Sequence, residues 1–380
     1  MVISQEEHLK YHYNSKTQFL NISLYLKTKT TLIKMDRILV IGDNHFMRNN
    51  SLETDEMVNK ILEVARNNRY DFAVLLGDIL DTHETMHIGP FCRAINFMEQ
   101  LSKLVPKLFV IVGNHDRPNN AVFLTDEHPF FACKSWANTV IVDKVTEYNN
   151  YLFVPYVQVG RFKEAVETHL GEDNYETLKK YNIVFAHQEF KGCSMGAIKS
   201  ESGDVYDTSN PLCISGHIHV YEELQPNLIY PGTPIQHSYG DSPDKALMDM
   251  KFNTIDKTFS YDRIKLGLPR KLVVHIDAEQ LMEYKVPENS FVKLVVSGQN
   301  DKVREMMKLD KVKEMLSSQR VKLSIQDVKK SKISSEITNN PDLLSDVINT
   351  KFIPFQERLS KILTQETPAI QVLSEKIFRS

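Results

Sequence analysis

The sequence predicts an α/β fold in which short buried strands end on residues suited to chemistry. Two observations support this. Five short apolar runs each end close to an Asp, Asn or His, and helical periodicity separates the first three of them. A short apolar run followed by glycine is typical of a buried strand. Alternation of strand and helix implies parallel pairing through right-handed crossovers.

The polar side chains follow the five runs in order along the chain. The runs and their polar residues are Ile38–Ile41 with Asp43 and His45, Phe72–Leu76 with Asp78, Leu108–Val112 with Asn114 and His115, Ile183–Ala186 with His187, and Leu212–Ser215 with His217 and His219. In open α/β sheets, chemistry collects at the carboxyl ends of the strands. Apart from His115, we therefore expect two carboxylates, one amide and four imidazoles in one crevice, a set that suits two metal ions.

Further elements follow from periodicity. Helices are expected over 53–69, where Met57, Ile61, Leu62, Val64 and Ala65 recur at helical spacing, and after Pro90, through Leu101. The stretch 148–157 predicts a strand, and 162–180 predicts a helix interrupted by Gly171. Short strands are expected at 228–230, 246–252 and 259–264, which would close a first domain over residues 35–266.

A second, smaller α+β unit is expected over residues 267–330. Its strands are predicted at 271–276, 291–296 and 321–325, with a helix over 302–317. Residues 301–332 hold ten Lys or Arg against five Asp or Glu, and a solvated helix face explains this surplus at least as well as a surface that faces DNA.

The two ends of the chain stand apart from these units. Residues 1–34 form an N-terminal extension without candidate chemistry, and residues 331–340 are polar and predict a linker. Residues 341–380 predict two amphipathic helices, which should pack on the body of the protein or on a partner.

Composition limits the function only weakly. The chain has 380 residues with 42% hydrophobic and 25% charged residues, and its formal net charge is −3. This charge gives no general case for nucleic-acid binding, so any DNA contact must come from local patches. The four cysteines show no close pairing, which favours a reducing intracellular compartment, cytoplasm or nucleus, over secretion. No apolar run is long enough to span a membrane.

The spacing of the polar residues favours metal binding. Asp43 and His45 are two residues apart, as are His217 and His219, so each pair can face one ion from extended backbone. Asp78 has two oxygens and can bridge two ions. Nitrogen and oxygen ligands without thiolate suit Mn²⁺, Fe²⁺, Zn²⁺ or Mg²⁺. His115, beside Asn114, is then free to act as a general acid.

Each pattern alone is weak, since most isolated Asp-x-His pairs lie in surface loops, but coincidence is a poor explanation for all five in order. Histidines outside this context are expected in surface or structural positions; they are His83, His87, His128, His169 and His237. Among these, His83 lies close enough to Asp78 in the sequence to deserve comparison with the site. Asp116 is expected to orient its loop rather than to bind metal.

Taken together, Asp-x-His, Gly-Asp-x-x-Asp, Gly-Asn-His-Asp, the isolated His187 and Gly-His-x-His resemble the calcineurin-like metallophosphoesterases over roughly residues 36–265. The resemblance implies a two-sheet sandwich flanked by helices. It implies one metal on Asp43, His45, Asp78 and His219, and a second on Asp78, Asn114, His187 and His217. It also implies that His115 is the catalytic acid.

Within that superfamily, Tyr230–Gln236 followed by Gly240-Asp241 is similar to the nuclease subunits of the SbcC–SbcD type, which include the meiotic-recombination nuclease and its T-even phage counterpart. This implies a DNA exonuclease and endonuclease with two Mn²⁺ that acts in DNA replication, recombination and repair. It further implies a capping domain at 267–330, a homodimer of the nuclease subunit, and an SbcC-like ATPase bound through 341–380. Leu80-Asp81 stands where many members carry an aromatic residue and a histidine.

Two other functions remain open on the sequence alone. One is a metallophosphoesterase that acts on nucleotides or phosphoproteins. The other is a non-catalytic scaffold that keeps the fold and binds DNA or the ATPase, although the complete set of ligand candidates argues against it.

Overall fold

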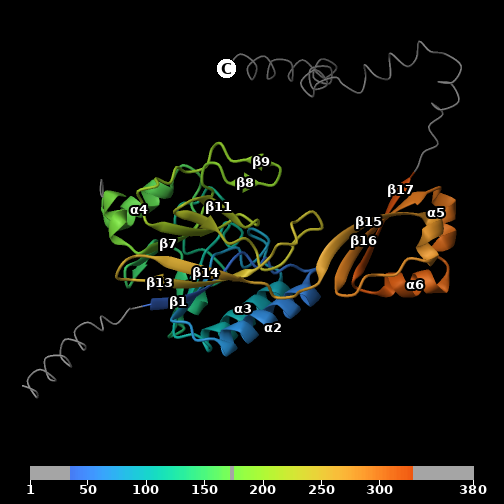
Figure 1. Cartoon of the computed structure of the whole chain (residues 1–380), viewed down its shortest axis with the longest axis horizontal. Helices are drawn as coiled ribbons and strands as arrows, with labels where there is room; N and C mark the ends of the chain where they lie inside the picture. Colours follow the sequence, from blue (N-terminus) through green and yellow to red (C-terminus); the bar gives the residue numbers. More distant parts are fainter. Residues whose placement is uncertain (1–34, 172–174, 328–380) are drawn as a thin grey trace, which may run out of the picture. The chain divides into compact units, whose positions relative to one another are not determined.

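The structure is a computed structural model that describes residues 35–171 and 175–327 (Figure 1). These residues divide into two compact units. The first comprises 35–274, 285–294 and 315–322, and the second comprises 275–284, 295–314 and 323–327. The predicted extension at 1–34, the linker at 331–340 and the helices at 341–380 lie outside the described residues.

The first unit contains a six-stranded sheet in the order β14-β13-β1-β2-β3-β4. Its strands are β1 (Met35–Ile41), β2 (Phe72–Leu75), β3 (Leu108–Ile111), β4 (Thr139–Val142), β13 (Leu247–Asn253) and β14 (Phe259–Ile264). Strands β1 to β4 pair in parallel, and β13 and β14 extend the sheet in antiparallel fashion. The crossovers run through α2 (Ser51–Asn67) and α3 (Ile88–Ser102), as the helical periodicity predicts.

A second six-stranded sheet of this unit has the order β11-β12-β10-β7-β6-β5. Its strands are β5 (Thr146–Tyr148), β6 (Tyr151–Val154), β7 (Ile183–His187), β10 (Leu212–Gly216), β11 (Glu222–Gln225) and β12 (Leu228–Tyr230). Strands β6, β7, β10 and β12 run parallel to one another. A small hairpin of β8 (Ser194–Met195) and β9 (Ile198–Lys199) follows β7.

Alternating side chains assign each face of the two sheets to a different core. Ile38 and Val40 of β1 pack in a core that also holds Phe153 of β6 and Phe185 of β7, so this core lies between the sheets. Leu39 and Ile41 turn the other way, to the core beneath α2 and α3. The outer face of the second sheet packs against α4 (Phe162–Leu170) in a third core.

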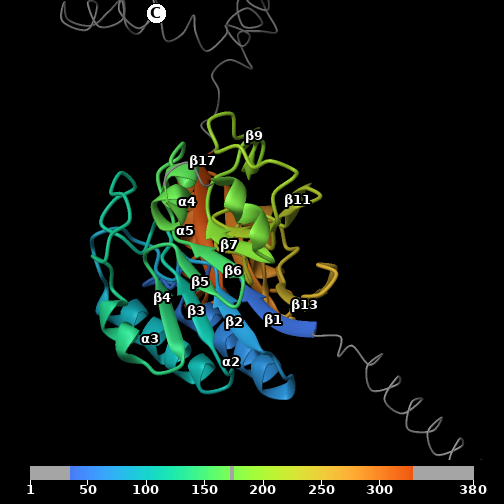
Figure 2. The ribbon, with the colours of Figure 1, turned by 90° about the vertical axis from the view of Figure 1, so that its left-hand side faces the viewer.

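Figure 2 shows these layers, with α2 and α3 on one side of β1 to β3 and α4 beyond β6 and β7. The prediction of an α/β sandwich of two sheets flanked by helices is confirmed.

Three predicted elements differ in detail. The strand expected at 148–157 is a hairpin of β5 and β6, because Asn149 and Asn150 have φ of 48° and 63° and form a tight turn between them. Asparagine tolerates these left-handed angles better than most residues, and two-residue hairpin turns need them. The helix expected over 162–180 ends at Leu170, where Gly171 has a φ of 93°, and a 3₁₀ helix (Tyr175–Lys180) follows.

The predicted helix over 302–317 is also interrupted. It consists of α5 (Asn300–Met306) and α6 (Asp310–Ser317). Tight i→i+3 bonds from the N–H groups of Lys308 and Leu309 end α5 before Asp310 begins the next helix. Strands β15 (Arg270–Asp277), β16 (Ser290–Gly298) and β17 (Val321–Asp327) form a three-stranded sheet, joined between the first two strands by a 3₁₀ helix (Ala278–Met282). None of the helices in the described ranges is long and apolar enough to cross a membrane.

Candidate metal centre

The predicted site residues lie where strands of both sheets end. Asp43 and His45 follow β1, Asp78 follows β2, and Asn114 and His115 follow β3, while His187 ends β7 and His217 and His219 follow β10. The site therefore crosses from one sheet to the other. Three of these residues adopt positive φ angles, with values of 43° for His45, 47° for Asp78 and 80° for His217. Such backbone is costly for residues other than glycine and is commonly retained at functional sites.

Two glycines allow the side chains to crowd together. A Cβ on Gly77, whose φ is 110°, would lie 2.5 Å from Nδ1 of His187. A Cβ on Gly113 would lie 2.2 Å from Oδ1 of Asp78. Both distances are far below van der Waals contact, so these positions require glycine if the two side chains are to stay in place.

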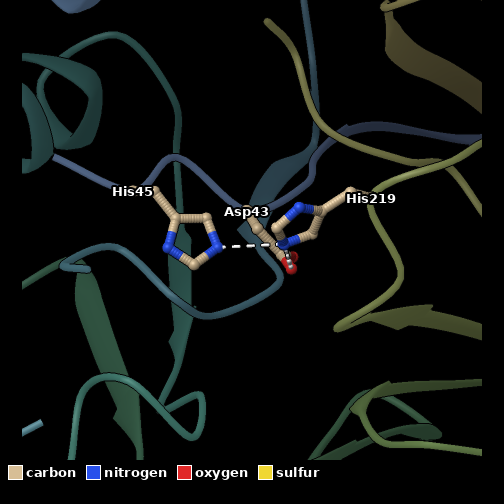
Figure 3. A group of neighbouring side chains, drawn as sticks. All are labelled: Asp43, His45 and His219. Atoms are coloured by element: carbon tan, nitrogen blue, oxygen red, sulfur yellow. Dashed lines mark hydrogen bonds and ion pairs between the residues drawn. The ribbon is translucent and has the colours of Figure 1, made fainter. Parts of the chain in front are cut away.

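The first group of candidate ligands consists of Asp43, His45 and His219 (Figure 3). The Nε2 atoms of the two histidines are 3.1 Å apart, and Oδ2 of Asp43 is 3.8 Å from Nε2 of His219. Ligand atoms about 2.1 Å from one ion lie roughly 3.0–3.4 Å from each other at angles between octahedral and tetrahedral. The histidine pair is thus spaced for one ion, and the carboxylate lies within a small adjustment of it.

The second group consists of Asp78, Asn114, His187 and His217. Oδ1 of Asn114 lies 3.0 Å from Nε2 of His187 and 3.0 Å from Nδ1 of His217. Nδ1 of His187 donates to the carbonyl of Leu76 at 2.8 Å, because a carbonyl can only accept. Its Nε2 is therefore the nitrogen that faces the group, and the hydrogen bond holds the ring as metal-binding histidines are commonly held.

Asp78 joins the two groups. Its Oδ2 lies 3.7 Å from Nε2 of His45 and 3.4 Å from Nε2 of His187. Its Oδ1 accepts the backbone N–H of His115 at 2.9 Å, which fixes the carboxylate from behind. One buried carboxylate thus faces a member of each group.

The site concentrates charge that a cation would balance. Burial raises the pKa of Asp43 to about 6. Burial also opposes ionisation of Asp78, but the charge of His187 and a hydrogen bond from it prevail and hold the pKa of Asp78 well below its usual range. Although burial alone would lower it, the pKa of His187 rises to about 9 through the charges of Asp78 and Asp43.

The two histidines after β10 behave differently. Burial, and then the charge of His187, lowers the pKa of His217 to about 3. Burial, and then the charge of His45, lowers the pKa of His219 to about 4. Both rings are therefore neutral at pH 7 and can offer lone pairs to a metal.

His115 lies at the edge of the site rather than within either group. Its Nε2 is 4.0 Å from Oδ2 of Asp78, and 31% of its side chain is exposed. Its Nδ1 donates to the backbone carbonyl of Asp81 at 2.6 Å, so Nε2 is the nitrogen free to meet a substrate. His83 stacks on its ring with a centroid distance of 4.6 Å.

Asp116 is buried and binds backbone. Its carboxylate accepts the N–H groups of Ile79, Leu80 and Gly113 at 2.9–3.1 Å. It thereby ties the loop after β3 to the loop after β2, in agreement with the expectation that it orients its loop.

Sequence reasoning missed two residues of the site. His237, expected in a surface or structural position, has a structural position within the site: its Nε2 donates to the carbonyl of Asp43 at 3.1 Å, and its ring lies 4.8 Å from that of His45. Its position directly after Tyr230–Gln236 could have indicated it. Asp81 occurs in the sequence motifs without an expected role in the site, yet its Oδ1 lies 3.3 Å from Nδ1 of His45.

Comparison with known proteins agrees with this geometry. Residues 36–221 match the family described as Calcineurin-like phosphoesterase. The chain is 41% identical over 272 residues to "Putative phosphoesterase 078R" of Invertebrate iridescent virus 3. The matched region covers 70% of this chain and 77% of the relative. It is 46% identical over 221 residues to "Putative phosphoesterase 244L" of Invertebrate iridescent virus 6. That match covers 57% of this chain and 76% of the relative. The chain therefore belongs to the calcineurin-like phosphoesterases, hydrolases of phosphoesters that use divalent metal ions.

Proposed function

We propose that this protein is a two-metal phosphodiesterase that cuts DNA. The observation that carries the two-metal part is the position of Asp78, whose Oδ2 faces His45 on one side and His187 on the other. Asp43, His45, Asp78 and His219 would hold one ion, and Asp78, Asn114, His187 and His217 the other. Neutral imidazole, amide and carboxylate ligands suit Mn²⁺, the metal we propose.

The chain's own residues account for the remaining chemistry. When bound by these residues, divalent ions would supply Lewis-acid chemistry to a phosphodiester and to the attacking water. His115 presents Nε2 beside Asp78 and delivers a proton to the leaving oxygen. The carbonyl of Asp81 holds Nδ1–H of the same ring, so the ring cannot turn away from that oxygen. The exposed part of His115 lets a substrate reach it from solvent.

Two features favour DNA over other phosphoesters. The segment Tyr230–Gln236, which is similar to that of SbcD-type nucleases, contributes to the site: the N–H of Thr233 donates to the carbonyl of His219 at 3.3 Å. His237, the next residue after the segment, binds the backbone of Asp43. The chain also continues beyond the sandwich into the β-strands and helices of 270–327, as those nucleases do. On the same resemblance we propose that the protein is a homodimer and binds an SbcC-like ATPase through 341–380.

Substrate profiling tests the function. The Mn²⁺-loaded chain is incubated with linear duplex DNA, single-stranded DNA, bis(p-nitrophenyl) phosphate, p-nitrophenyl phosphate and a phosphopeptide. We expect cleavage of DNA and of the diester, little action on the monoester or the phosphopeptide, and loss of both diester activities in Asp78→Asn. A preference for the monoester or the phosphopeptide would instead establish the phosphatase function, and inactivity on all five would refute the proposed phosphodiesterase.

The metal assignment has its own control. Asp78→Asn keeps the size of the side chain but removes the charge shared by both groups, so we expect it to bind fewer than two Mn²⁺ per chain. The control variant is Asp244→Asn. It changes an exposed carboxylate that belongs to neither group of candidate ligands and pairs with Arg263 and Lys265. That variant should keep the wild-type metal content and rate.

A further inference from the structure

We propose that the pocket beside His115 binds the nucleoside that carries the leaving oxygen of the substrate. The pocket has a volume of about 320 Å³. Its walls include His115, Arg117, Glu84 and Glu127, together with the apolar side chains of Leu80 and Met86. The proposal rests on the proposed function and names the part of the substrate that this site recognises.

The position of the pocket follows from His115. A general acid must lie within about 2.6–3.2 Å of the oxygen that it protonates. The free Nε2 of His115 therefore marks where the leaving oxygen sits, and His115 is itself a wall of the pocket. The group attached to that oxygen must extend away from the metal site, and this pocket adjoins the acid.

A larger neighbouring cavity is a poorer candidate. It has a volume of about 500 Å³ and shares Leu80, Thr82 and Met86 with the pocket beside His115. Its other walls include Arg48 and Asp81, but not His115. A leaving group placed there would lie in a cavity that the proton donor does not line.

The lining of the smaller pocket suits a base better than a phosphate. Leu80, Met86, Pro118 and Pro129 offer apolar surface for the faces of a ring. Glu84 and Glu127 add carboxylates, which repel phosphate and can accept hydrogen bonds from the amino groups of adenine, cytosine or guanine.

Arg117 supports the same choice. It is only 3% exposed, and its Nη1 and Nη2 donate to the carbonyls of Tyr156 and Val122. Recognition of phosphate by arginine usually uses two parallel N–H groups. Here Nη1 and Nη2 are both engaged with backbone, and Nε is buried without a hydrogen-bond partner within the described part of the chain. The guanidinium is therefore held by backbone and is not presented to the pocket as a free fork for phosphate.

Product inhibition tests the pocket. Hydrolysis of bis(p-nitrophenyl) phosphate by the Mn²⁺-loaded full chain is measured with increasing deoxyadenosine or deoxycytidine, which carry no phosphate. We expect competitive inhibition of the wild type. Glu127→Trp, which places a large ring at an exposed position of the lining, should weaken the inhibition at least tenfold. Glu176→Trp, on an exposed position outside the lining, should leave the inhibition constant unchanged.

A second measurement does not depend on a folded variant. Bound Mn²⁺ should speed the magnetic relaxation of base protons of deoxyadenosine in the presence of the wild-type chain, and zinc in place of manganese should abolish the effect. Absence of inhibition and of relaxation, or equal inhibition of Glu127→Trp with its metal retained, would overturn the proposal. Nucleoside binding by an enzyme that leaves DNA intact would refute the proposed nuclease activity and support the nucleoside pocket. DNA cleavage without nucleoside binding would support the nuclease activity and refute the pocket.

Discussion

Gly113→Ala should disable the metal centre although no candidate ligand is altered. The added Cβ would lie 2.2 Å from Oδ1 and 2.3 Å from the backbone nitrogen of Asp78. Ordinary contact between such atoms begins near 3.4 Å, so the two atoms must separate by about 1.2 Å. Neither atom of Asp78 can move away easily, because the residue is buried and its Oδ1 accepts a hydrogen bond from the N–H of His115.

This displacement exceeds what metal sites tolerate. Ligand distances in such sites hold to about 0.2 Å, and a misplacement of about 1 Å can cost 10²-fold in rate. Since Asp78 faces both groups of ligands, both are disturbed at once. We expect Gly113→Ala to bind less than one Mn²⁺ per chain and to lose at least about 10²-fold in kcat/KM for bis(p-nitrophenyl) phosphate.

Metal analysis by mass spectrometry and diester hydrolysis check this prediction. Gly240→Ala is the matched control, because its Cβ would meet only Oγ of Ser238 at 3.7 Å. The control should keep its metal and its melting temperature. Two bound ions and near wild-type turnover in Gly113→Ala would refute the reasoning that Asp78 is shared and cannot move.

Three further predictions follow from the site and the chain. His115→Asn should keep both metals and lose about 10²–10⁴ in rate, as expected for a general acid; loss of an ion from that variant would make His115 a ligand. Mn²⁺ binding should release protons at pH 7 and tighten by roughly tenfold per pH unit towards pH 9, since the pKa of His187 is raised to about 9 and the ring must be neutral to bind metal; titration calorimetry in buffers of different ionisation enthalpy measures this, and a pH-independent affinity would contradict it. Removal of residues 341–380, which lie outside the described residues, should leave Mn²⁺-dependent DNA cleavage intact but abolish co-purification with the ATPase; an unchanged complex would place the contact elsewhere.

The strands of the site could be predicted because their pattern is local. A run such as Ile38–Ile41 is apolar at every position, since β1 is buried on both faces, and the polar residues begin only where the strand ends. The seven candidate ligands and His115 were identified in this way. The hairpin at Asn149 and Asn150 was missed because the apolar pattern of β6 hides the turn before it.

What the sequence by itself determined was the identity of the strands and of the polar residues at their ends, because hydrophobic burial acts on neighbouring positions along the chain. Only the tertiary structure decided that β1 to β3 and β7 with β10 belong to different sheets, whose carboxyl ends meet at one site. It alone placed His237 against Asp43 across 194 residues, and Asp81 beside His45. These contacts depend on how distant segments pack, which no local pattern encodes, and they set the distances on which the proposed chemistry depends.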